Sequence, residues 1–169
     1  MPFLASIKPW WCGLEFIISP ADGTDLPRIM EILKMVNMHN IPSPEMPELD
    51  LNLCLVARCD GAILGMCGFK MLSAETGKTT LLAVDPQYRM HGVGRALQLA
   101  RMERMIGLGA KRIITNADRP ESIEWYKKHF GYREVGKLKK AHEFGHPGID
   151  RWTTLELDVS DWMSRNGRN

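Results

Sequence analysis

The chain has 169 residues, of which 44% are hydrophobic and 25% charged, and its formal net charge is +2. This length suits one globular domain with a buried core, and the composition excludes a disordered chain, a collagen and a coiled-coil rod. A near-neutral total also argues against a protein that mainly coats nucleic acid. No segment approaches the roughly 18 apolar residues of a membrane span, and the start of the chain lacks the apolar stretch of a signal peptide.

Four cysteines are present, and no two of them have C-x-x-C spacing. Cys54 and Cys67 lie among apolar neighbours, which predicts buried free thiols rather than a metal site or a disulfide framework. Free thiols are typical of a reducing compartment, so we expect a cytoplasmic protein.

The first elements in chain order are a strand over residues 14–19 and a helix from Leu26 to Val36. Apolar residues recur at threes and fours along the helix, and Asp25 is positioned to cap it. Residues 40–50 contain three prolines and predict a loop.

Two runs rich in β-forming residues, 52–59 and 62–72, flank Asp60-Gly61. An Asp-Gly pair in this position predicts a tight hairpin. A second turn near residues 75–77 leads into an apolar strand over 79–85.

The second half alternates helices and strands. We predict helices over 92–108 and 120–130 and strands over 111–117, 132–139 and 151–159. In the first helix, polar side chains step by three residues along one side: Arg95, Gln98, Arg101 and Arg104. This order predicts an α/β (α+β) fold with a mixed, mostly antiparallel central sheet of about six or seven strands flanked by helices. The expected division is an N-terminal extension (1–13), one domain (14–159) and a C-terminal tail (160–169).

A strand-to-helix turn between Val84 and Leu97 is the most informative stretch. Backbone N–H groups converge at a helix start, and its dipole favours an anion. Gly92 and Gly94 remove side chains where a phosphate would approach, and Arg89 and Arg95 add positive charge.

Other phosphate motifs fit this turn poorly. The P-loop sequence is absent, and a dinucleotide-binding fingerprint needs Gly or Ala where Leu97 stands. Two glycines alone would favour a connection without a ligand, but the arginine and the preceding strand favour ligand binding.

Residues 89–94 (RMHGVG) match the signature Q/R-x-x-G-x-G/A, and the preceding V-D-P-x-Y-R is also familiar from the GNAT superfamily of acyl-CoA-dependent N-acetyltransferases. Residues 124–132 (EWYKKHFGY) resemble that superfamily's F-Y-x-K-x-G-F segment, with one extra residue before the glycine. The chain therefore resembles a GNAT acetyltransferase over residues 14–159. The resemblance does not identify a substrate, because one fold serves many.

The resemblance implies acetyl-CoA as co-substrate, with its pyrophosphate on the turn after the strand. The implied contacts are Arg89, Met90, His91, Gly92, Val93, Gly94, Arg95 and Ala96. Leu82, Ala83 and Val84 would hydrogen-bond the pantetheine arm, and the Val84 N–H would face the thioester carbonyl. A donor to a developing oxyanion contributes on the order of 3 kcal/mol in other enzymes.

Tyr126 matches the family tyrosine near the CoA sulfur, where its phenol would protonate the leaving thiolate. Alternatively, it is a buried aromatic residue of a helix. Asn116, Ser122 and Lys128 are further candidates for cofactor contacts. The family often has Asn where Arg119 stands and Ala where Ser122 stands, so this sequence departs from the family at those two places.

The base that deprotonates the amine has several candidates, because residues 79–82 offer no carboxylate. Glu75 precedes the strand, and the last loop carries His142, Glu143, His146 and Asp150; any of these could act directly or through water. His142 and His146 are four residues apart, but a loop rich in Gly and Pro is not a helix, so we expect no metal site. By analogy, residues 40–50 and 141–150 would flank the acceptor pocket. Plausible lining residues are Met38, His39, Met46 and Phe144.

The leading hypothesis is an enzyme, an N-acetyltransferase acting on a primary amine of a small metabolite such as an amino acid or amino sugar. The alternatives are a protein lysine or N-terminal acetyltransferase and a non-catalytic acyl-CoA-binding module. We expect no nucleic-acid or membrane partner. GNAT-like proteins are often dimers, so the resemblance leaves a homodimer as an alternative to a monomer.

The charge distribution supports an anionic ligand. Residues 1–85 carry a net charge of −4, residues 86–140 of +8 and residues 141–169 of −2. The basic third contains the expected CoA turn, and CoA carries a charge of about −4.

Overall fold

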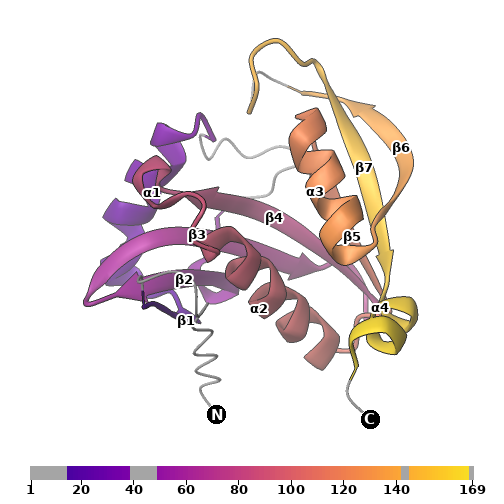
Figure 1. The fold of residues 1–169 in the computed structure, drawn as a ribbon, viewed down its shortest axis with the longest axis horizontal. Helices are drawn as coiled ribbons and strands as arrows, with labels where there is room; N and C mark the ends of the chain where they lie inside the picture. The colour runs from indigo at the N-terminus through magenta and orange to yellow at the C-terminus, as the bar shows by residue number, and fades with distance from the viewer. Residues whose placement is uncertain (1–14, 39–48, 142–144, 168–169) are drawn as a thin grey trace. The chain divides into compact units, whose positions relative to one another are not determined.

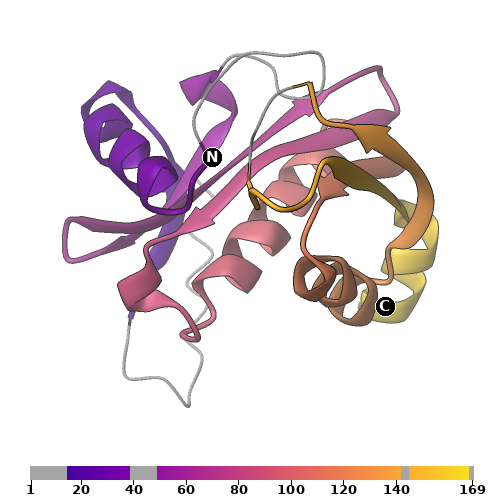
Figure 2. The same ribbon diagram turned by 90° about the horizontal axis from the view of Figure 1, so that it is seen from above.

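The computed structural model describes residues 15–38, 49–141 and 145–167. Several predictions fall outside these ranges: the extension 1–13 with Cys12, most of the proline-rich loop, and the candidates His39, Met46, His142, Glu143 and Phe144. Figures 1 and 2 show the fold from two directions.

Seven strands form one mixed sheet in the order β1-β2-β3-β4-β5-β7-β6 (Figure 1). The strands β4 and β5 pair in parallel. Antiparallel pairs are β1 with β2, β2 with β3, β5 with β7, and β6 with β7. The predicted fold class is therefore confirmed.

The chain divides into two compact units. The first unit comprises the described residues up to Phe69 together with Thr80–Glu103. Its elements are β1 (Ile17–Pro20), η1 (Gly23–Asp25), α1 (Leu26–Met35), η2 (Leu51–Leu53), β2 (Cys54–Cys59), most of β3 (Ala62–Met71), the end of β4 (Thr76–Val84), η3 (Pro86–Tyr88) and the start of α2 (Val93–Gly107).

The second unit comprises Lys70–Thr79 and the described residues from Arg104 onward. Its elements are the start of β4, the end of α2, β5 (Arg112–Ala117), α3 (Pro120–Phe130), β6 (Arg133–Lys139), β7 (Arg151–Asp158) and α4 (Val159–Asn166). The helix α4 occupies most of the segment expected to be a tail. The Asp158 carboxylate caps it by accepting from the Asp161 N–H.

Local sequence signals explain several of these elements. At the β2–β3 hairpin, Asp60 has φ 47° and Gly61 has φ 83°, the two positive angles that an Asp-Gly turn requires. Gly131, with φ 79°, ends α3 as predicted.

The start of α1 differs from the prediction. The Asp25 side chain makes no capping bond to α1; it binds the Arg58 guanidinium at 2.5 and 2.8 Å instead. Asp22 caps η1, the short helix before α1: its carboxylate accepts from the Thr24 N–H at 2.8 Å, and Asp25 Oδ2 accepts from the Asp22 N–H at 2.9 Å. The first strand also starts later than predicted, at Ile17.

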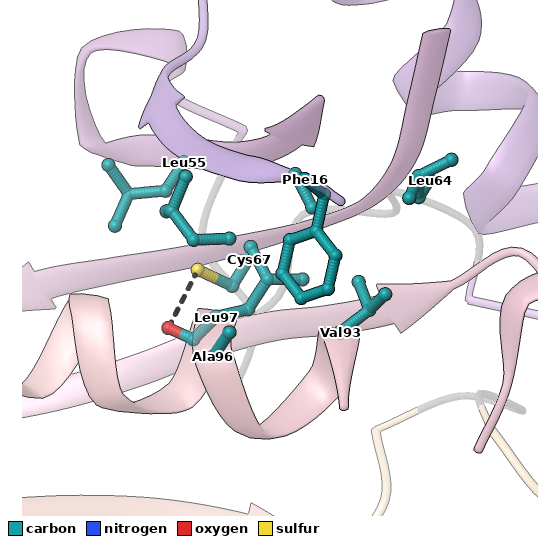
Figure 3. Packing of buried hydrophobic residues seen from close by; sticks show 9 residues of the cluster. Phe16, Leu55, Leu64, Cys67, Val93, Ala96 and Leu97 are labelled. Carbon is teal, nitrogen blue, oxygen red and sulfur yellow. Dashed lines mark hydrogen bonds between the residues drawn. The ribbon is translucent and has the colours of Figure 1, made fainter. Parts of the chain in front are cut away.

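The core of the first unit lies between its strands and α2. Phe16, Leu55 and Leu64 meet Val93 and Leu97 in one buried cluster (Figure 3). In both ribbon views α1 lies on the opposite side of these strands from the start of α2. This packing fixes the N-terminus of α2 beside the end of β4.

Arg101, one of the polar side chains that step along one side of α2, is buried. Its side chain is 1% exposed and donates to the carbonyls of Gly68 at 3.1 Å and Leu81 at 2.8 Å, and to the Gln98 amide oxygen. A buried cation needs such acceptors. Arg101 therefore holds α2 against β3 and β4 and is not a phosphate ligand.

Candidate active site

After β4 the chain passes through η3 and then through the turn that begins at Arg89. This turn leads into the first residues of α2, up to Ala96. Met90 has φ 67° and Gly92 has φ 80°. A left-handed methionine is uncommon, and such backbone strain is concentrated at functional sites. Where residues in left-handed conformations alternate with residues in right-handed ones, successive backbone N–H groups point to the same side and form an anion-binding concavity. The Met90 side chain is 98% exposed, so its conformation is not explained by burial of the side chain.

Gly94 lies in the first turn of α2. A Cβ atom there would lie 3.7 Å from Val84 Cγ2, an ordinary contact. The protein's own packing therefore leaves room for a methyl group at this position. Glycine in a helix is unfavourable by about 1 kcal/mol relative to alanine, so its presence fits the close approach of a ligand to the backbone.

The three candidates for the pantetheine arm are the last residues of β4. Leu82 and Val84 are half-buried against the core cluster, and Ala83 is buried. The described ladder between β4 and β5 covers Thr76–Lys78. At the next position, the Thr79 hydroxyl donates to the Thr115 hydroxyl at 2.5 Å.

Asp85 connects the end of β4 to the turn. Its Oδ1 accepts from the Gln87 N–H at 2.9 Å, and its Oδ2 accepts from the Arg28 guanidinium at 2.5 Å. Burial raises the pKa of Asp85, but these two donors outweigh it, so the pKa lies below the usual range. Arg28 comes from α1 and also donates to the Ile63 carbonyl.

The remaining cofactor candidates lie in the second unit. Asn116 is on β5, and its side-chain oxygen accepts from the Thr154 hydroxyl at 2.8 Å. Ser122 is half-buried and Lys128 is exposed, both on α3.

Tyr126 lies on the buried side of α3. Its ring has edge-to-face contacts with Trp125, at 4.9 Å between centroids, and with Tyr132, at 5.2 Å. The side chain is 7% exposed. These contacts fix the orientation of the ring, as a positioned acid requires.

A buried ion pair anchors the β6–β7 loop. Lys140 Nζ lies 2.9 Å from Asp118 Oδ2, and the two side chains are 4% and 11% exposed. The ammonium also lies 4.6 Å from the centroid of the Trp152 ring. The same carboxylate oxygen accepts from the His146 N–H at 2.7 Å. Sequence reasoning missed this pair, because its partners are 22 residues apart.

Gly145 completes this arrangement. It has φ 71°, and a Cβ atom there would lie 2.5 Å from Asp118 Oδ2. Only glycine allows the loop to approach the carboxylate this closely. Burial raises the pKa of Asp118, but the His146 N–H and the Lys140 ammonium outweigh it, so the pKa is lowered overall.

His146 Nδ1 accepts a hydrogen bond from the Gly148 N–H at 3.1 Å. A neutral imidazole bonded in this way carries its proton on Nε2. In this tautomer Nε2 is a hydrogen-bond donor and cannot accept a proton.

Glu75 lies in the turn before β4, and Val84 is the last residue of that strand. The Glu75 carboxylate forms an ion pair with Lys111 at 2.6 Å, and both side chains are more than half exposed. Asp150 is exposed beside β7.

The described cysteines fit the predicted free thiols, since Cys54 and Cys67 are buried and unbridged and Cys59 is half-buried. Burial raises the pKa of the Cys54 thiol to about 12 and that of Cys67 to about 11. Such thiols are poor nucleophiles at neutral pH.

Within residues 15–38, 49–141 and 145–167, no three His, Cys, Asp or Glu side chains are grouped so that they could hold a metal ion. Over the same ranges, no helix is both long and apolar enough to span a bilayer.

Residues 26–132 match the model of the acetyltransferase (GNAT) family, so the chain belongs to that family. It is similar to the mycothiol acetyltransferase of Geodermatophilus obscurus, at 29% identity over 127 residues, which cover 68% of this chain and 40% of that protein. The chain thus spans less than half of this relative's length.

Two solved structures share the fold. One is the N-acetylglutamate synthase of Neisseria gonorrhoeae in complex with coenzyme A and N-acetyl-glutamate, with a TM-score of 0.68, 19% identity, and coverage of 85% of this chain and 35% of that one. The other is the ribosomal-protein-S18-alanine N-acetyltransferase of Escherichia coli, with a TM-score of 0.67, 19% identity, and coverage of 85% and 94%. At these identities the likeness concerns the fold alone.

Proposed function

We propose that the chain is an N-acetyltransferase that moves an acetyl group from acetyl-CoA to a primary amine by direct attack. The observation that carries the proposal is the turn at the start of α2, with left-handed Met90 and Gly92 and a helical Gly94 that packing does not require. Family membership and CoA in a structure of the same fold support it.

In the proposed reaction the amine nitrogen attacks the thioester carbonyl, a C–N bond forms and the C–S bond breaks. The Val84 N–H stabilises the charge that develops on the carbonyl oxygen. Tyr126 gives its phenolic proton to the departing thiolate. Both roles rest on positions within the family motifs.

The ammonium must lose one proton before it attacks. Glu75 is held in an exposed ion pair, and His146 presents a donor. We therefore propose that water takes this proton and that neither side chain is the direct base.

A small amine, such as an amino acid or amino sugar, is the proposed acceptor. The alternative is the N-terminus or a lysine of a protein; the Escherichia coli enzyme of the same fold, a ribosomal-protein-S18-alanine N-acetyltransferase, makes this alternative worth testing.

The test incubates the protein with acetyl-CoA and a library of amines, peptides included, while released thiol is measured. Thiol release that depends on one amine class supports the proposal and identifies the acceptor. If no amine raises thiol release and calorimetry detects no binding of acetyl-CoA, the proposal fails. Binding without turnover would favour the non-catalytic module.

A further inference from the structure

The ion pair between Arg28 and Asp85 lies where three segments of the first unit meet. Arg28 is on α1, Asp85 follows β4, and the Asp85 N–H donates to the Leu64 carbonyl at 2.8 Å. Arg28 Nε also donates to the Ile63 carbonyl at 3.3 Å. The pair thus joins α1, the start of β3 and the end of β4.

Asp85 extends this connection into the turn. Its other oxygen caps η3 through the Gln87 N–H, and the residue after η3 is Arg89, where the turn begins. The Asp85 side chain is 9% exposed, so its charge is poorly solvated and needs its partner.

Charge makes the pair relevant to an anion. A carboxylate close to a phosphate site would repel the ligand, and the Arg28 guanidinium, which also pairs with Glu31 at 3.1 Å, offsets the Asp85 charge. Without Arg28, Asp85 would keep its negative charge or rotate toward water and release the Gln87 N–H. Either change would weaken an anion site built from backbone N–H groups.

We infer that Arg28 and Asp85 are positioning residues that hold the pyrophosphate turn in its binding conformation and shield it from the Asp85 charge. The inference rests on the proposed function, because the ligand is taken to be CoA. It assigns to α1 a role in cofactor affinity.

The chain offers a closely matched control. Arg58 and Asp25 form a second Arg–Asp pair in the same unit, with the same 2.5 Å contact and side chains 25% and 4% exposed, against 29% and 9% for Arg28 and Asp85. Asp25 precedes α1 and Arg58 is on β2, so this pair does not reach the turn.

The experiment measures the Kd of CoA by calorimetry, together with thermal melting, for the wild type, Arg28→Met, Arg28→Lys, Asp85→Asn, the double variant Arg28→Met/Asp85→Asn, and Arg58→Met. Couplings of this kind change affinity by roughly 2- to 30-fold. We expect Arg28→Met to raise the Kd about tenfold. Arg28→Lys should raise it less, because it keeps the charge, and Asp85→Asn should raise it less, because it keeps a capping oxygen.

The double variant should bind CoA better than Arg28→Met, since the uncompensated carboxylate is gone. Arg58→Met should lower the melting temperature as much as Arg28→Met and leave the Kd unchanged. The inference is overturned if Arg28→Met binds CoA like the wild type, or if Arg58→Met raises the Kd equally. A wild type that does not bind CoA would overturn the proposed function, and the inference with it.

Discussion

Asp85 and Asp118 occupy equivalent local positions, one in each unit, but their surroundings differ. Each directly follows a strand, accepts a backbone N–H from one of the next two residues and binds a cation from a distant element. Asp118 also accepts from the N–H of His146, 28 residues away. Arg28, the partner of Asp85, is 29% exposed and is shared with Glu31. Lys140, the partner of Asp118, is 4% exposed and packs on Trp152.

This difference indicates different tasks. A deeply buried pair contributes little net energy but is strongly destabilising when one partner is removed. The Asp118 region therefore holds Gly145 and His146 in place beside the end of β5. The Asp85 region has a cation that water can reach, and it adjoins the turn that we assign to the ligand. We expect substitutions to affect mainly stability at Asp118 and mainly CoA affinity at Asp85.

The largest effect is expected for Lys140→Met. Asp118 would stay buried with its Lys140 cation gone, so the free energy of unfolding should fall by about 3 kcal/mol and the melting temperature by about 6–12 °C. Calorimetric or circular-dichroism melting measures this. Lys127→Met is the control, because Lys127 forms exposed ion pairs with Glu124 and Glu134, and its melting temperature should not change. If Lys140→Met and Lys127→Met have the same melting temperature, the claim that the Asp118 region mainly supports stability is wrong.

A kinetic variant separates chemistry from packing in the second unit. Tyr126→Phe keeps the ring contacts with Trp125 and Tyr132 and removes the hydroxyl. We expect kcat to fall about 100-fold, as for loss of a general acid, with the Kd of CoA nearly unchanged. If kcat stays within about twofold of the wild type, Tyr126 is a packing residue and the second unit supplies no acid from this position.

The sequence predicted features that depend on local patterns. The Asp60-Gly61 hairpin, the glycine that ends α3 and the turn before α2 each follow from residues within a few positions of one another. The buried role of Arg101 depends on the carbonyls of Gly68 and Leu81, 33 and 20 residues away, so its three-residue spacing from Gln98 and Arg104 does not reveal it. The partners Lys140 and Asp118 are likewise far apart in the sequence, by 22 residues, so no local pattern predicts their contact.

The sequence carries a local signal for the start of α4. Asp158 is followed three residues later by Asp161, a spacing typical of a helix N-terminus. Among the site residues, the roles assigned to Tyr126, Val84, Glu75 and His146 stay predictions.

The pH dependence of stability compares the two carboxylates directly. Asp85 and Asp118 both have lowered pKa values, so each contributes stability that is present above the unfolded value of about 3.9 and is lost as the pH falls through the folded pKa. Urea unfolding should therefore show a decline in stability below about pH 4. Asp118→Asn should reduce this decline more than Asp85→Asn, because the Lys140 ammonium is the more buried cation. The reverse order would contradict the contrast.

The smallest effect is expected for Glu75→Gln. The carboxylate pairs with exposed Lys111 in the turn before β4, and surface pairs contribute little. Its kcat should stay within about twofold of the wild type with an unchanged pH–rate profile. A tenfold or greater loss together with a shifted acidic limb would identify Glu75 as the base and overturn the proposed water route.

Calorimetric titration of CoA into Gly94→Glu tests the central claim most directly. Glutamate in the first turn of a helix is compatible with its dipole, so the variant should melt near the wild-type temperature. Its added bulk and charge would occupy the anion site, so the Kd should rise about 100-fold or more. Gly107→Glu, the same change at the other end of α2, where a Cβ atom meets nothing within 4 Å, should bind CoA like the wild type. Wild-type affinity in a folded Gly94→Glu variant would show that CoA does not bind at this turn.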